Sequence, residues 1–286
     1  MVHGTLLRIS LLVAALLVGG CNVLSPKPIP TEKQYLPAAL VDDKSSPIEV
    51  GRPIKWLDTI GWVIGIPSKI LLWDRRMDNH KITEPTLDAT AIYLEANELP
   101  HVKVRMNQYA PLQDLKRLRK NNTVGWPYRY TIGLLSVGGE AIFAGRVFGG
   151  DHFNPFTQTV HLYSDSPAIA YHELGHAKDF SRRKWQGTYA ILYGFVPSYH
   201  EVIASRDALD YVYDRHDRDG IIEANRLLYP AMGTYGGNAL GYLSPANAVA
   251  LYYGTVVAGH INGRMLSRNI DQHLAQYDAM FKSKQR

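Results

Sequence analysis

The strongest fold signal in this chain lies in residues 157–176, which read TQTVHLYSDSPAIAYHELGH. Residues 157–164 alternate apolar and polar side chains, a pattern that predicts a β-strand. Ser166 followed by Pro167 is typical of a helix start, because serine caps free backbone N–H groups and proline has no N–H to satisfy in the first turn. We therefore expect a strand that leads directly into a helix.

The predicted helix contains the pattern H-E-x-x-H, formed by His172, Glu173 and His176. Residues four apart lie on one face of an α-helix, so the two imidazoles can bind one metal ion. Glu173 follows the first histidine and is placed to act as a general base on a water molecule. The chain has a single cysteine, which excludes a cysteine-based site. The expected cofactor is therefore Zn2+ held by histidine and carboxylate.

A catalytic zinc ion needs a third protein ligand and leaves its fourth position to water. The metzincin pattern fails because Asp179 and Arg182 stand where glycine and histidine are required. A variant with an aspartate ligand fails because Ala190 occupies the ligand position. Glu201, on the following predicted helix, is the remaining candidate. The competing interpretation is a helix cap, since Ser198 and Glu201 form the pattern S-x-x-E.

The HELGH motif, together with the later segment EVIASRD at residues 201–207, resembles the gluzincin peptidases. The resemblance is strongest to the group that contains CAAX prenyl endopeptidases and periplasmic quality-control lipoproteins. It covers roughly residues 155–215 and is specific for the two helices. It implies a mainly helical, zincin-like domain in which Glu201 is the third zinc ligand.

The same resemblance implies roles for residues around the metal. Ser205 stands where the family has an aspartate that orients a ligand histidine, and Asp179 and Asp207 are the alternatives for that role. The strand before the helix corresponds to the family's edge strand, which pairs with an extended substrate through its main chain. The central residues of that strand are Val160, His161 and Leu162.

The reaction implied by these residues is zinc-assisted hydrolysis of a peptide bond. Zinc lowers the pKa of a bound water towards ~7, and Glu173 takes its proton and later delivers it to the leaving amine. An additional donor usually stabilises the oxyanion. The sequence leaves five candidates for that donor, namely Tyr199, His200, Arg206, Tyr253 and His260.

The first twenty residues have the organisation of a secretion signal, with an early arginine, an apolar run and small residues at the end. Residues 17–21, LVGGC, resemble the lipobox of bacterial lipoproteins, in which the cysteine, here Cys21, is acylated. Asn22 follows, where an acidic residue would favour the inner membrane. We therefore expect a lipid anchor in the outer membrane, with the protein facing the periplasm.

Residues 21–53 are rich in proline, which predicts an extended tether. Residues 54–286 then form the globular body. We expect an α+β fold for it, mainly helical and zincin-like, with a small antiparallel sheet whose edge strand precedes the HELGH helix.

Several further segments carry local signals. Helices are expected at residues 83–99 and 111–120, and a half-buried strand at residues 102–106. β-Branched and aromatic residues in the segment 128–147 predict one or two strands. The apolar segment 56–73 is interrupted by polar residues, which favours packing in the core over a membrane interface.

Charge and glycine content bear on partners. The net charge is +5, but lysines and arginines are scattered along the chain, so a nucleic-acid partner is not expected and an anionic membrane suits the surface equally well. Glycines punctuate residues 233–259, which carry no fixed charge. Close helix packing is the favoured interpretation of this stretch, and membrane association is the alternative.

These features predict a lipid-anchored zinc endopeptidase of the bacterial envelope that acts on protein or peptide substrates, including misfolded proteins. An alternative is a non-catalytic envelope lipoprotein with a structural metal site, whose glycine-rich region binds a membrane or a partner. A zinc hydrolase that cleaves non-peptide cell-wall bonds is a third interpretation. The sequence predicts no oligomeric state.

Overall fold

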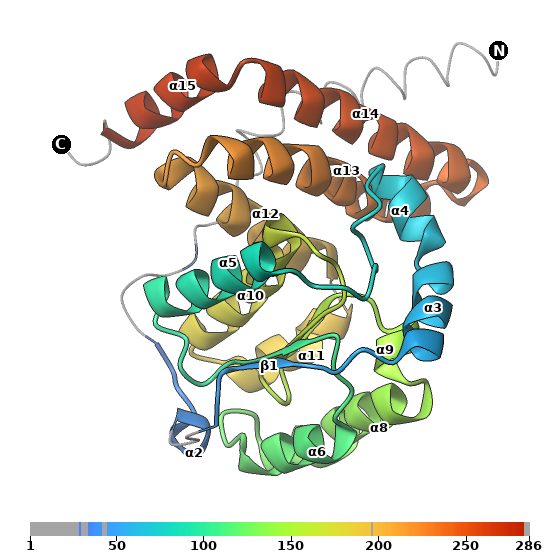
Figure 1. Cartoon of the computed structure of the whole chain (residues 1–286), viewed down its shortest axis with the longest axis vertical. Coiled ribbons are helices and arrows are strands. Elements are labelled where there is room, and N and C mark those ends of the chain that lie inside the picture. Colours follow the sequence, from blue (N-terminus) through green and yellow to red (C-terminus); the bar gives the residue numbers. More distant parts are fainter. Residues whose placement is uncertain (1–28, 30–33, 42–44, 196, 283–286) are drawn as a thin grey trace. The chain divides into compact units, whose positions relative to one another are not determined.

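The computed structural model describes residues 29, 34–41, 45–195 and 197–282 (Figure 1). The predicted signal segment and Cys21 lie outside these residues. The described chain divides into two compact units, residues 29–208 and 209–282, which are considered separately. Within the described ranges, no helix is both long enough and apolar enough to cross a membrane.

The first unit is built around a four-stranded sheet in the order β1-β2-β4-β3. The strands are β1 (Ile48–Val50), β2 (Lys103–Met106), β3 (His152–Asn154) and β4 (Thr159–Leu162). β1, β2 and β4 are parallel, whereas β3 is antiparallel to β4. The unit is mostly helical, as expected for an α+β fold. The prediction of an antiparallel sheet is wrong, because helices connect β1 to β2 and β2 to β4, and such crossovers produce parallel pairing.

The strand before the HELGH helix is not an edge strand. β4 pairs with β2 on one side and with β3 on the other, so His161 lies opposite both Arg105 and His152. The backbone groups of β4 are therefore used within the sheet. The expectation that Val160, His161 and Leu162 pair with a substrate is wrong for this reason.

Helices cover both faces of the sheet (Figure 1). On one face lie α5 (Glu84–Ala96) and α10 (Pro167–Arg182), and on the other α6 (Pro111–Lys120) and α8 (Leu134–Ile142). Phe153 of β3 packs against Phe180 of α10, with ring centroids 5.8 Å apart. Arg105 of β2 points to the other face, where its Nε lies 3.0 Å from Asp114 Oδ1 of α6.

Because both faces are covered, β2 is fully buried rather than half-buried as the alternation of its sequence predicted. Its two cations keep polar partners inside the unit. Lys103 Nζ donates to Ser45 Oγ at 2.7 Å, and the Arg105 guanidinium pairs with Glu49 and Asp114. Burial of a charged group is tolerated when it is paired in this way.

The helices α5 and α6 confirm two sequence predictions, but the strands expected in residues 128–147 are absent. This segment instead forms α7 (Trp126–Tyr128), a π-helical turn η1 (Arg129–Gly133), α8 and α9 (Gly145–Phe148). A Cβ atom at Gly133 would lie 2.8 Å from Leu118 and 2.9 Å from Phe156. Tertiary packing of this kind outweighs the β-propensity of single residues, which depends on context.

The apolar segment 56–73 forms α3 (Lys55–Ile64) and α4 (Ile66–Leu72). Trp56, Ile70 and Trp73 are each more than 60% exposed, at 68%, 67% and 63%, so the core prediction is wrong for them. The residue of α3 that faces inward is instead Gly61, which is buried against the side chain of His80.

Part of the predicted tether belongs to the folded unit. Tyr35 N donates to Ser181 O at 2.7 Å, and Leu40 in α2 (Ala38–Val41) is buried. β1 then supplies a strand of the sheet. The tether prediction is therefore wrong for the described residues before position 53.

The remaining elements of the described chain are α11 (Gln186–Phe195), α12 (Pro197–Asp214), α13 (Arg218–Leu243), η2 (Pro245–Asn247), α14 (Ala248–Arg268) and α15 (Ile270–Lys282).

The glycine-rich stretch lies mainly in α13 and α14, two long helices of the second unit. α13 and α14 pack antiparallel through glycines: Cβ atoms at Gly233 and Gly263 would lie 2.5 Å and 2.1 Å from backbone oxygens of the opposite helix. This confirms close helix packing, and membrane association stays a prediction.

A buried histidine makes the first unit sensitive to acid. His101 is 1% exposed, and its Nε2 lies 2.8 Å from Ser181 Oγ. Burial, helped by the nearby Arg117 guanidinium, lowers the pKa of His101 from 6.5 to about 3. The unfolded chain therefore binds this proton more readily, and the free energy of unfolding should fall by several kcal/mol as pH drops from about 6.5 to about 3.

We predict that His101→Gln makes this pH dependence shallower. The measurement is urea unfolding at several pH values between 3 and 7, with the exposed His216→Gln as the matched control. A slope in His101→Gln equal to that of the unsubstituted protein would contradict the assignment.

Candidate metal centre

The HELGH motif lies in the middle of α10, which begins as predicted. Ser166 Oγ accepts a hydrogen bond from Ile169 N at 3.4 Å. His172, Glu173 and His176 are all buried. The two imidazole rings share one face of the helix, with centroids 4.8 Å apart and planes nearly perpendicular.

Helix α12 brings Glu201 to these two histidines. Glu201 Oε2 lies 2.9 Å from His172 Nε2 and 3.3 Å from His176 Nε2. Two ligands on one tetrahedral zinc, each at ~2.1 Å, are ~3.4 Å apart, so the observed separations fit a shared cation. This position favours the ligand interpretation of Glu201 over the helix cap.

A glycine between the two histidines allows the approach of α12. A Cβ atom at Gly175 would lie 3.1 Å from the backbone oxygen of Ala204 and 3.2 Å from its Cα. The backbones of α10 and α12 therefore pass in contact at this point. Glu201 stands one helical turn before Ala204, within reach of the histidines.

Electrostatics separate the two glutamates. Burial by itself raises the pKa of Glu201, but His176 and His172 outweigh it and hold the pKa well below its ordinary value. Burial raises the pKa of Glu173 to about 8, and the charge of His176 opposes this only in part. Glu173 Oε2 is buried and has no hydrogen-bond partner among the described residues. The site thus holds the ionised carboxylate of Glu201 between the two histidines. The Glu173 carboxyl lies beside them, and its Oε2 accepts no hydrogen bond from the described residues.

Ser205 contacts the first histidine through a hydrogen bond. Its Oγ lies 3.1 Å from His172 Nδ1, which leaves His172 Nε2 directed to Glu201. Asp179 instead accepts from Arg183 Nε at 2.7 Å, and Asp207 accepts from Lys178 Nζ at 2.5 Å and from the Tyr93 hydroxyl. Each of these two carboxylates thus pairs with a cation, and the orientation of a ligand histidine by Asp179 or Asp207 stays a prediction.

Two tyrosines of α11, which sequence reasoning missed, pack against His176 and His200. The Tyr193 ring meets His176 edge-on at 5.2 Å, and Tyr189 contacts His200 at 4.4 Å. Among the oxyanion candidates, His200 is buried and burial lowers its pKa to about 4, whereas Tyr199 is half exposed. Tyr253 and His260 belong to the second unit.

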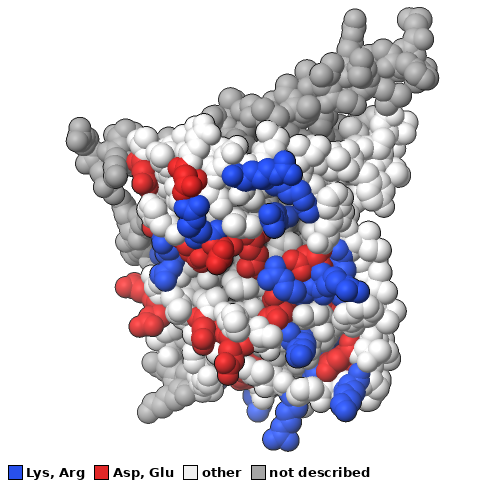
Figure 2. All heavy atoms as spheres, turned by 45° about the horizontal axis from the view of Figure 1, so that its top comes forward, with Lys and Arg blue, Asp and Glu red and all other residues white. Residues whose placement is uncertain are grey.

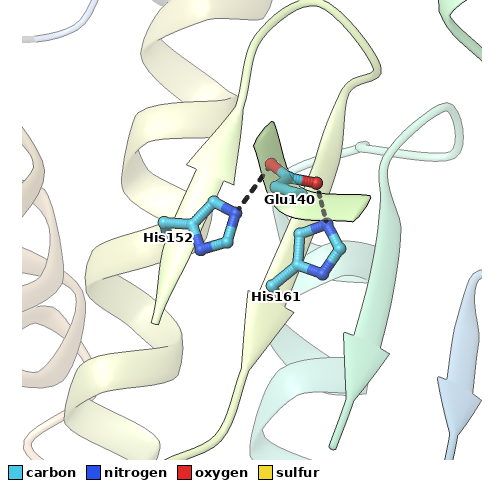
Figure 3. A group of neighbouring side chains, drawn as sticks. All are labelled: Glu140, His152 and His161. Atoms are coloured by element: carbon cyan, nitrogen blue, oxygen red, sulfur yellow. Dashed lines mark hydrogen bonds and ion pairs between the residues drawn. The ribbon is translucent and has the colours of Figure 1, made fainter. Parts of the chain in front are cut away.

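A second group of metal-ligating side chains also lies in the first unit. Glu140, His152 and His161 point toward one another from α8, β3 and β4 (Figure 3). Sequence reasoning assigned His161 to the substrate strand and missed the other two. The three residues stand at positions 140, 152 and 161, farther apart than neighbours on one helical turn or in one tight turn, and the register of β3 with β4 places the histidines side by side.

Charged side chains of both signs are interspersed on the face drawn in Figure 2. This distribution agrees with the scatter of lysines and arginines along the sequence.

Comparisons with protein-family models, with curated proteins and with solved structures found no match to this chain.

The contact at Gly175 yields a prediction. Gly175→Val places a branched side chain against the Ala204 backbone, which should displace α12 and cost about 1–3 kcal/mol of stability, as overpacking typically does. Because the displacement moves Glu201 from the histidines, we also expect weaker Zn2+ binding in a competition titration. The control is Gly236→Val on α13, where a Cβ atom meets nothing within 4 Å. Equal zinc affinity in the two variants would contradict this role of Gly175.

The hydrogen bond between Ser205 and His172 yields a second prediction about zinc binding. Ser205→Ala should weaken Zn2+ binding about 10–100-fold, the usual cost of losing a partner that orients a ligand histidine. Ser205→Asp restores an acceptor for His172 Nδ1 and should recover most of that affinity. Ser198→Ala, on the same helix, serves as the control. Full affinity in Ser205→Ala, measured by the same titration, would show that Ser205 does not orient the ligand.

Proposed function

We propose that this protein is a zinc-dependent peptidase of the gluzincin type. The observation that carries the proposal is the convergence of His172 Nε2, His176 Nε2 and Glu201 Oε2, whose ligand atoms lie within 4.8 Å of one another. Glu173, adjacent to the first ligand, is the expected general base.

The donor set supports zinc in particular. Two imidazole nitrogens and one carboxylate oxygen are the ligands of many catalytic zinc sites, which leave a fourth position for water. Glu173 Oε2 is buried and has no hydrogen-bond partner in the part of the chain that the structure describes. This supports a role in chemistry, because a buried carboxyl oxygen otherwise finds a hydrogen-bond donor.

When bound, zinc would polarise the scissile carbonyl and make water more acidic. The charge of a bound zinc ion would lower the pKa of Glu173 that burial raises, and so favour its ionised form. Ionised Glu173 takes a proton from the attacking water as the water oxygen bonds to the carbonyl carbon. The same carboxyl then gives the proton to the amine nitrogen as the C–N bond breaks. Ser205 keeps His172 in one orientation throughout, since its bond to Nδ1 fixes the ring.

The address and substrate of the enzyme are proposed from the sequence. Acylation of Cys21 would anchor the chain in the outer membrane, where the enzyme would face the periplasm. The expected substrates are proteins or peptides. The proposal includes no substrate strand, because β4 is already paired on both sides.

Two substitutions test the proposal. Glu173→Gln should retain zinc, and its rate of hydrolysis of an unfolded protein such as casein should fall about 10²–10⁴-fold. The reason is that an amide side chain cannot accept the proton of the attacking water near neutral pH. Glu201→Ala should lose the zinc ion at this site and should lose hydrolytic activity as well. Zinc is measured by elemental analysis and activity by release of fluorescent peptides.

Glu95→Gln, an exposed change on α5, is the matched control and should keep zinc and activity. Hydrolysis by Glu173→Gln at the rate of the unsubstituted protein would refute the role of Glu173. Zinc binding without hydrolysis of any peptide would favour the alternative, a non-catalytic lipoprotein with a structural metal site.

A further inference from the structure

We propose that Glu140, His152 and His161 form a second, structural site for a divalent first-row transition metal, with Zn2+ as the expected occupant. The proposal is independent of the peptidase function. Its residues come from the α8 side of the sheet, whereas the HELGH helix packs on the opposite face, where Phe153 meets Phe180.

The strand register builds the histidine pair. His152 and His161 are direct partners in the antiparallel pair β3–β4, and their rings stack at 4.7 Å with planes 11° apart. Both Nε2 atoms face the Glu140 carboxylate (Figure 3): His152 Nε2 lies 3.1 Å from Oε1, and His161 Nε2 lies 3.8 Å from Oε2. The three ligand atoms of this group fall within 4.8 Å of one another.

A proton alone does not account for this arrangement. An imidazolium at His152 satisfies its own contact with Glu140. His161 Nε2, however, is buried with no hydrogen-bond partner among the described residues, and 3.8 Å is too long for such a bond. It is close to the ~3.4 Å between two ligands of one tetrahedral zinc. A cation between the three side chains satisfies all of them.

The surrounding groups hold the ligands as partners around metal sites do. His152 Nδ1 lies 3.0 Å from the Gly150 carbonyl oxygen, which fixes the tautomer that directs the Nε2 lone pair to the cation. Gly150 has φ +63°, a conformation that favours glycine. Asn154 Nδ2 donates to Glu140 Oε1 at 3.0 Å and to Ser136 Oγ at 2.8 Å, which orients the carboxylate.

A small pocket opens at the same three side chains. Its lining also includes Tyr109, Asp114 and Tyr163. The His152 side chain is 26% exposed and that of His161 is 5% exposed, so a cation can reach the ligands from the His152 side. Two imidazoles and a carboxylate select zinc or a neighbouring first-row ion over Mg2+ or Ca2+, which prefer oxygen ligands.

Such an ion would connect α8 to the β3–β4 hairpin. α8 lies shortly before this hairpin in the chain, and β4 leads within a few residues into α10. The expected role is therefore to stabilise the sheet that carries the HELGH helix. Metal binding of this kind adds to folding stability, because the unfolded chain has no assembled site.

The test uses the full chain, stripped with a chelator, loaded with Zn2+ and dialysed. Elemental analysis should give two zinc ions per chain. His161→Asn and Glu140→Gln should each give one, Glu201→Gln should give one, and the double variant His161→Asn/Glu201→Gln should give none. The control His216→Asn, an exposed histidine, should keep two.

A second measurement covers variants that fold poorly. Zn2+ should raise the thermal midpoint of Glu201→Gln, in which the second site is intact, and should fail to raise that of His161→Asn/Glu201→Gln. Zinc content in His161→Asn and Glu140→Gln equal to that of the unsubstituted protein would overturn this proposal alone. Zinc content unchanged only in Glu201→Gln would overturn the peptidase site and leave the second site standing.

Discussion

The close approach of α10 and α12 at Gly175 is the contact on which the candidate metal centre depends. It lets the Glu201 carboxylate meet two imidazoles that α10 presents on one face. A buried carboxylate or imidazole costs free energy unless it finds a partner of opposite character. In this arrangement the Glu201 carboxylate contacts the Nε2 atoms of both histidines. The Ser205 hydroxyl contacts Nδ1, on the other side of the His172 ring.

The sheet explains why α10 is where it is. β4 is an inner strand, paired on both sides, and the chain passes from it into the Ser166 cap. The helix therefore starts from one of the most constrained parts of the unit. Complete pairing of β4 also removes it as a site for an extended substrate, so peptide binding in the proposed enzyme must use other surfaces.

Two groups with the same donor set arise in this unit by different routes. In the HELGH helix, two histidines meet because residues four apart share a helical face, and the third ligand comes from another helix. In the second group, the histidines are nine residues apart and meet through strand pairing, and Glu140 comes from α8. Only the first route leaves a recognisable motif, which explains why sequence reasoning found one group and missed the other.

Local patterns therefore determined the helix start at Ser166, the helices α5 and α6 and the paired histidines of α10, because each depends on spacing within one segment. Glu201 became a candidate by elimination of other third ligands, and the role of Ser205 was implied by the family resemblance alone. Tertiary structure decided the parallel pairing of β1, β2 and β4, the burial of Lys103 and Arg105, the helical state of residues 128–147 and the meeting of Glu140 with His152 and His161. These features depend on which distant segments pack together. Periodicity along the chain records that a residue faces a core, but it carries no information on the segment that covers it.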